Sequence, residues 1–138
     1  MAGYVLPIKW NEDNRAKWVG TRPGYSGEHI SSYSSVTNGV INMYTVPPAK
    51  MLLLFNDRIS IAQQIAGLGE GILQIYDTVP ARIYRIHRIS AFNAGSNESE
   101  SYCRDLPYPV PAGYYIQLQS IGASLIANGG FEGVLIDV

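Results

Sequence analysis

The chain has 138 residues, of which 46% are hydrophobic and 15% are charged, and its formal net charge is -1. This length suits one domain with a core of its own, and the balanced charge lacks the basic excess that contacts to nucleic-acid phosphates require. Because an average soluble domain has about 25% charged residues, we expect partner proteins to cover part of this surface.

Cysteine content and hydropathy indicate the cellular compartment in which the protein is made. Cys103 is the only cysteine, so a disulfide within the chain is not expected. The first residues do not read as a signal peptide, and the longest apolar run, Met51–Phe55, is far shorter than the roughly 20 residues of a membrane helix. We therefore expect a protein that is made in a cytoplasm and has no contact with a membrane.

Residues 1–36 differ from the rest of the chain, because their aromatic residues stand in a polar sequence without a period of 2 or 3.6. These aromatic residues are Trp10, Trp18, Tyr25 and Tyr33. One interpretation is an extended N-terminal arm whose tryptophans bury against another surface. The other is a set of irregular strands packed on the domain, and the sequence leaves both open.

From Thr37 to Val138 the sequence reads as one strand after another. Runs rich in Ile, Val, Leu and Tyr alternate with breaks made of Gly, Pro, Asn and Ser. About eight strands at a spacing of about 8–12 residues are typical of a β-sandwich or barrel. We predict an all-β domain over residues 37–138.

Two runs predict local detail. Tyr114, Ile116 and Leu118 alternate with polar or exposed neighbours, as in a strand with one buried face. From Ala81 to Asn93 isoleucines recur every three residues, which indicates a strand with a β-bulge or, alternatively, a short helix.

The stretches "VPPAK" at 46–50 and "VPAGY" at 110–114 repeat one pattern. Proline cannot donate to a strand ladder, so each stretch ends a strand and turns the chain before the next one. Two such corners in matching halves of the strand series suit two Greek keys folded over one core, the double-sheet jelly roll of about eight strands. Unrelated proline turns are the alternative.

Catalytic and metal-binding patterns are weak. A jelly-roll metal site needs clustered histidines and a carboxylate, whereas the chain has only His29 and His87. Arg85 and Arg88 flank His87 and should disfavour both its protonation and a metal cation. A site formed by both histidines with Glu28 or Asp57 stays open as the lesser alternative.

Other catalytic chemistries find no better support. Cys103 lies in a predicted strand and is interpreted as a small buried apolar residue. The glycine-rich stretch Gly67–Gly71 lacks the Lys-Ser/Thr of a phosphate loop and is interpreted as a hairpin loop. We expect a protein that is not an enzyme and has no cofactor and no metal.

Three arginines, Arg82, Arg85 and Arg88, fall on one predicted strand. They could form a stripe that binds carboxylates of a neighbouring subunit, since guanidinium groups match carboxylates bidentately. The alternative is that they pair with carboxylates of their own chain, such as Glu98, Glu100 or Asp105.

The order of corners and strands from Val46 to Val138 resembles the small jelly-roll domains of bacteriophage structural proteins, especially capsid cement (decoration) proteins. The resemblance is carried by "VPPAKMLLLFNDRISI", "PYPVPAGYYIQLQS" and the glycine-rich turn before the last strand, although Lys50 replaces the glycine of the first corner. It does not extend to the arm.

The resemblance implies a virion structural protein on the outer capsid surface. Such a protein would be a homotrimer that binds the major capsid protein through its arm and its oligomer contacts. The partner-binding residues would then be Trp10, Trp18, Tyr25, Arg82, Arg85 and Arg88. The alternative is a carbohydrate- or receptor-binding jelly-roll module of a phage tail or fibre, in which Tyr102, Tyr114 and Tyr115 would form an exposed aromatic face.

Overall fold

The computed structural model describes residues 27–78 and 81–138, and every regular element in these ranges is a β-strand. The strands are β1 (Glu28–Thr37), β2 (Gly39–Thr45), β3 (Lys50–Ala62), β4 (Gly69–Thr78), β5 (Ala81–Ala91), β6 (Asn97–Pro111), β7 (Tyr115–Ile121) and β8 (Ile126–Asp137). These ranges contain no helix with the length and hydropathy needed to span a membrane.

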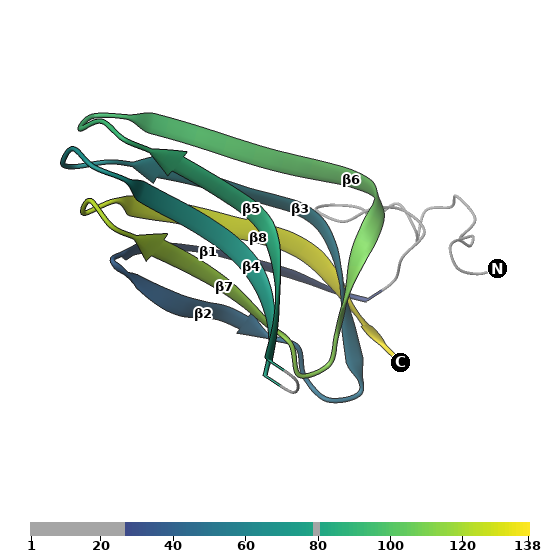
Figure 1. Cartoon of the computed structure of the whole chain (residues 1–138). Coiled ribbons are helices and arrows are strands. Elements are labelled where there is room, and N and C mark those ends of the chain that lie inside the picture. The colour runs from purple at the N-terminus through teal and green to yellow at the C-terminus, as the bar shows by residue number, and fades with distance from the viewer. Residues whose placement is uncertain (1–26, 79–80) are drawn as a thin grey trace.

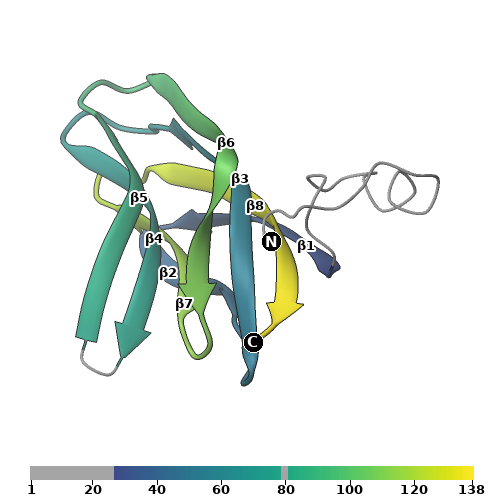
Figure 2. The same cartoon turned by 90° about the vertical axis from the view of Figure 1, so that its right-hand side faces the viewer.

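The strands form two four-stranded antiparallel sheets, with the orders β1-β8-β3-β6 and β2-β7-β4-β5. We call them sheet A and sheet B. Apart from the β4–β5 hairpin, each connection carries the chain from one sheet to the other, and the sheets face each other as two layers (Figures 1 and 2). This is the strand order of an eight-stranded jelly roll, and it confirms the predicted fold class.

The core lies between the sheets, because alternate residues of each strand point inward. Leu52 and Leu54 of β3, Ile116 and Leu118 of β7, and Phe131 of β8 are all at most 1% exposed. Burying each such side chain contributes about 1.5–3 kcal/mol. The alternation predicted for β7 is confirmed, since its glutamines lie on the opposite face from Ile116 and Leu118.

The two repeated proline stretches are corners between the sheets. The first links β2 in sheet B to β3 in sheet A, and the second links β6 in sheet A to β7 in sheet B. The corners also bind each other: the Val46 amide donates to the Tyr114 carbonyl at 3.0 Å, and the Gly113 amide donates to the Val46 carbonyl at 2.9 Å. Gly113 has a φ of 84°, a conformation that favours glycine.

The boundary placed at residue 36 is wrong in one part. Residues 28–36 belong to β1, which pairs with β8 at the edge of sheet A, so they are part of the sandwich. Ile30 and Val36 face the core, but the positions between them that also face inward are serines, which hid the period of 2. The rest of the predicted arm, residues 1–26, lies outside the described ranges.

Two further predictions concern loops and bulges. The interpretation of Gly67–Gly71 as a hairpin loop is wrong, because this segment connects sheet A to sheet B and its last three residues begin β4. The bulge predicted in β5 is confirmed: Leu73 lies opposite His87 and Gln74 lies opposite Arg85, so Ile86 is the additional residue.

Candidate functional site

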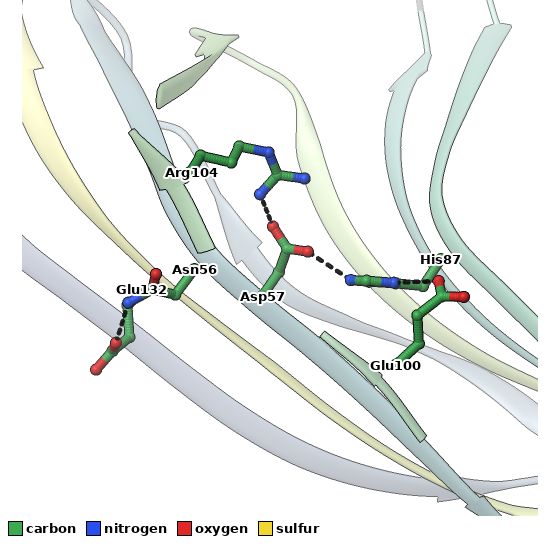
Figure 3. A network of polar contacts seen from close by, with 6 residues as sticks. All are labelled: Asn56, Asp57, His87, Glu100, Arg104 and Glu132. Carbon is green, nitrogen blue, oxygen red and sulfur yellow. Dashed lines mark hydrogen bonds and ion pairs between the residues drawn. The ribbon is translucent and has the colours of Figure 1, made fainter. Parts of the chain in front are cut away.

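A network of ionisable side chains joins the two sheets at the edge formed by β5 and β6. The Nε2 atom of His87 on β5 lies 2.5 Å from Oδ1 of Asp57 on β3, and its Nδ1 atom lies 2.5 Å from Oε1 of Glu100 on β6 (Figure 3). Arg104 of β6 donates to the other oxygen of Asp57. The network therefore connects sheet B to two neighbouring strands of sheet A.

The surroundings of His87 favour its charged form. Burial lowers the pKa of His87, but its hydrogen bonds with Asp57 and Glu100 and the negative charge of both carboxylates raise it above the ordinary value. Two carboxylates then face one imidazolium and one guanidinium, which balances the charge of the network. His87 is 1% exposed and Asp57 is 3% exposed, so neither charge is stabilised directly by water.

An aromatic ring covers this network. Tyr102 of β6 stacks on the His87 ring with centroids 4.5 Å apart and planes inclined by 19°. The guanidinium carbon of Arg104 lies 5.3 Å from the centre of the same tyrosine ring. Tyr102 thus contacts both cationic groups through its π face, an arrangement that favours positive charge.

The geometry suits a structural connection better than proton transfer. A general base needs a ring nitrogen that can reach a substrate proton, whereas both nitrogens of His87 face carboxylate oxygens of the chain itself. In the described parts of the chain, no group of three or more His, Cys, Asp or Glu side chains is arranged to hold a metal ion.

The expectation that arginines would disfavour protonation of His87 is wrong. The bulge at Ile86 turns His87 into the core while Arg85 and Arg88 are exposed on the outer face of sheet B. The inward neighbours of His87 are instead Asp57 and Glu100. The sequence contained a partial signal, since a histidine within a run of isoleucines is a candidate for burial. It named Asp57 with His87 only as a possible metal ligand, and nothing in it placed Glu100 beside His87.

The predicted arginine stripe lies on β5, one of the two edge strands of sheet B. Nε of Arg88 donates to Oε2 of Glu70 on β4 at 2.7 Å, so this arginine pairs within its own chain, though not with the carboxylates that the sequence suggested. Arg85 is exposed, and the backbone of Arg82 lies opposite Asp77. The other predicted partner-binding residues, Trp10, Trp18 and Tyr25, lie outside the described ranges.

Two other predictions about side chains are also wrong. Cys103 is exposed on β6 rather than buried. The three tyrosines of the possible sugar-binding face are not gathered: Tyr102 stacks on His87, Tyr115 stacks on Tyr76 in sheet B with centroids 6.3 Å apart, and Tyr114 packs against the core.

A groove of about 740 Å³ crosses the outer face of sheet A. Its lining is mostly polar and includes Ser35 of β1, Asn128 of β8, Ser60 of β3 and Ser99 of β6. Tyr33 is 52% exposed at the groove, and the guanidinium carbon of Arg58 lies 5.0 Å from the centre of its ring.

Large apolar side chains are exposed at one end of the sandwich. Three connections meet there, since the Gly67 amide donates to the Phe92 carbonyl at 2.9 Å and the Leu68 carbonyl lies close to Gly122. The exposed fractions are 54% for Ile65, 56% for Leu68, 64% for Phe92 and 43% for Ile121. We call these four residues the apolar loop end.

Comparisons with known proteins give structural matches only. No protein-family model and no curated protein sequence matches the chain. Among solved structures, a pentameric capsid protein isolated from metagenomic phage sequences is similar, with 14% identity and a TM-score of 0.42 over 97% of this chain and 77% of that one.

Two further structures are similar over smaller parts of their own chains. One is the capsular polysaccharide assembling protein CapF of Staphylococcus aureus, with 10% identity, a TM-score of 0.31, and coverage of 82% of this chain and 26% of that one. The other is the structure of infectious bursal disease virus, Gx strain, with 12% identity, a TM-score of 0.34, and coverage of 81% and 30%.

Proposed function

We propose that this chain is a non-enzymatic structural protein of a virus particle, and more narrowly a capsid decoration protein that binds and stabilises an assembled capsid lattice. The sequence resemblance to phage cement proteins supports this proposal. The jelly roll is compatible with it, although the same fold also serves lectins and cupins, so the fold alone does not decide the function.

The observation that carries the proposal is the apolar loop end. A monomeric protein rarely gathers exposed large apolar side chains on neighbouring loops, and such patches mark surfaces that bind other proteins. Backbone hydrogen bonds between the loops hold Phe92 close to the segment that carries Ile65 and Leu68. Binding would therefore bury a preformed apolar surface without first ordering a loop.

The non-enzymatic part of the proposal is supported by His87, whose two nitrogens face carboxylates of the chain itself. The proposed partner is the major capsid protein, which the chain would bind on the outer capsid surface. Further copies of the chain are proposed to bind it in a homotrimer. Trp10, Trp18 and Tyr25 with the arginines of β5 are proposed as additional contacts.

Purification of particles with and without a defect in the apolar loop end tests the proposal. The chain should co-purify at a fixed ratio with particles of the virus that encodes it, and Phe92→Asp should remove it. Asn93→Asp is the matched control, because it places the same charge on the next exposed residue and should preserve binding. Absence of the wild-type chain from purified particles would contradict the proposal.

The carbohydrate-binding alternative is favoured by one observation, the polar groove on sheet A with the exposed ring of Tyr33 beside several hydroxyl groups. A glycan array probed with the purified protein tests it. Binding that is lost in Tyr33→Ala but kept in Tyr84→Ala, an exposed tyrosine of sheet B, would favour this function over decoration.

A further inference from the structure

Two rows of side chains cross the four strands of sheet A in its polar groove. In the first row, Tyr33 lies opposite Gly130, Gly130 lies opposite Arg58, and Arg58 lies opposite Ser101. Tyr33, Arg58 and Ser101 are exposed. Because neighbouring strands lie about 4.8 Å apart, a row over four strands spans about 14 Å, so the groove has room for more than one sugar ring.

The first row provides an aromatic platform beside a cation. A Cβ atom placed on Gly130 would overlap the ring of Tyr33, so the ring lies against backbone that only a glycine leaves open. The guanidinium carbon of Arg58 lies 5.0 Å from the centre of this ring. Tyr33 is nevertheless 52% exposed. The ring is therefore supported from below and keeps apolar surface on which a ligand can stack.

The second row provides hydroxyl and amide groups. Ser35 lies opposite Asn128, Asn128 lies opposite Ser60, and Ser60 lies opposite Ser99. Oγ of Ser35 donates to Oδ1 of Asn128 at 2.6 Å, which fixes the orientation of both side chains. A hydroxyl group both donates and accepts hydrogen bonds. This row therefore matches the hydroxyl groups of a sugar, which also do both.

Charge is distributed unevenly along the groove. In the described parts of the chain, no carboxylate forms an ion pair with Arg58. Glu100, the other charged residue of the lining, pairs with His87. Beyond the second row a smaller hollow of about 230 Å³ continues the groove, and Glu98 lines it. An anionic group is therefore favoured beside Arg58 and disfavoured at the opposite end.

We propose that this groove binds an oligosaccharide that ends in a sugar with one carboxylate, such as sialic acid or glucuronic acid. The carboxylate accepts hydrogen bonds from the guanidinium group of Arg58, which matches it bidentately. The ring of the same sugar stacks on Tyr33, and the neutral sugars that follow lie over the second row. The groove, at about 740 Å³, has the size of sites that hold small ligands.

The single cation favours a carboxylate over a phosphate, because a phosphate monoester carries between one and two negative charges near pH 7. The proposal deepens the carbohydrate-binding alternative and rests on it, since it names the class of sugar and the roles of Arg58 and Tyr33. It does not depend on the decoration of a particle.

A glycan array probed with the purified full chain tests the class of ligand. The array carries oligosaccharides that end in sialic acid or glucuronic acid, and the same oligosaccharides with the carboxylate converted to its methyl ester. We expect binding to at least one acidic oligosaccharide. The ester should bind about tenfold or more weakly, the usual effect of losing a charge-assisted hydrogen bond.

Variants of the first row assign the two roles. Arg58→Gln removes the cation and should lower the affinity for the acidic oligosaccharide to that for its ester. Tyr33→Ala removes the platform and should abolish binding of both. Lys50→Gln is the matched control, because it removes the same charge at the other end of β3 and should leave binding unchanged.

The possible failures are distinguishable. Equal affinity for acid and ester, or unchanged binding by Arg58→Gln, would overturn the role of the carboxylate and leave carbohydrate binding in place. Tighter binding to polymers of galacturonic acid would overturn the single terminal carboxylate, since Glu98 should repel a polyanion. Absence of binding to every glycan would overturn the carbohydrate alternative as well, whereas co-purification with particles tests decoration separately.

Discussion

His87 and Asp57 lie in opposite sheets, and their facing atoms, Nε2 and Oδ1, are 2.5 Å apart. β5 and β6 are the last strands of their sheets, so this contact and the one between His87 and Glu100 connect the layers at an edge that no backbone ladder closes. A charged histidine is the group that makes both contacts favourable. The strength of the contacts between the two sheets at this edge should therefore depend on the protonation of His87.

The first prediction is that the free energy of unfolding decreases as the pH rises above about 6.5, the pKa of histidine in an unfolded chain. The pKa of His87 is raised in the folded protein. Its contribution to stability is therefore complete below the unfolded pKa and is lost as the pH rises through the folded pKa. Urea denaturation at a series of pH values from 6 to 9 measures this slope.

The matched control uses the other histidine. His87→Asn should abolish the slope and reduce stability by about 1–3 kcal/mol at the lower pH values, because buried Asp57 loses one charged partner and keeps only Arg104. His29→Asn changes an exposed residue of β1 and should preserve both the slope and the stability. A slope that is identical in the two variants would exclude His87 as its source.

The second prediction concerns the origin of the shifted pKa. Asp57→Asn removes one carboxylate from His87 while keeping a side chain of similar shape, so the pKa of His87 should fall relative to the wild type. Glu70→Gln removes a carboxylate that pairs with Arg88 and should leave the pKa of His87 unchanged. NMR titration of the ring protons measures both, and an equal pKa in the two variants would contradict the assignment.

The sequence predicted those parts of the fold that depend on backbone chemistry. Proline and glycine near Val46 and Gly113 placed the two corners correctly, because missing amide donors and a positive φ are properties of single residues. The spacing of the isoleucines at 83, 86 and 89 indicated the bulge in β5, because one additional residue in a strand interrupts the alternation of period 2. That the two corners bind each other required the structure.

The sequence was least informative where distant strands meet. β1 was predicted only as the alternative to an arm, because serines occupy inward positions between Ile30 and Val36 and give the segment a polar pattern. The ion pairs of His87 were not predicted, although Asp57 was named as a possible metal ligand beside it. Asp57 and Glu100 come from strands of the other sheet, whereas the residues near His87 in the sequence are cationic. Local charge is a poor guide to the surroundings of a side chain in a bulged strand.

The third prediction tests the packing of β8 against β3. A Cβ atom on Gly133 would lie 2.6 Å from the Leu53 carbonyl oxygen, which belongs to the backbone and cannot rotate away. Gly133→Ala should therefore reduce the free energy of unfolding by about 1–3 kcal/mol, the usual range for overpacking. In Gly39→Ala the new Cβ atom would meet Val36 at an ordinary 3.6 Å, so thermal denaturation should show almost no change for this control.

The fourth prediction follows from the proposed homotrimer. Arg85 is exposed on β5, one of the two edge strands of sheet B, and arginine is enriched where subunits meet. If Arg85 binds a carboxylate of a neighbouring copy, Arg85→Glu should weaken the assembly by placing like charges together. The loss should be larger at low salt, because the Debye length is about 8 Å at physiological ionic strength and increases on dilution of the salt.

Native mass spectrometry and light scattering at several protein and salt concentrations measure this assembly. Arg58→Glu is the control, since it makes the same charge change on the outer face of sheet A and should leave the oligomer intact if β5 forms the contact. A closed oligomer would also protect the edge strands β5 and β6 from pairing with other chains. A wild-type protein that is monomeric at every concentration and also binds particles as a monomer would contradict both the trimer and the role of Arg85.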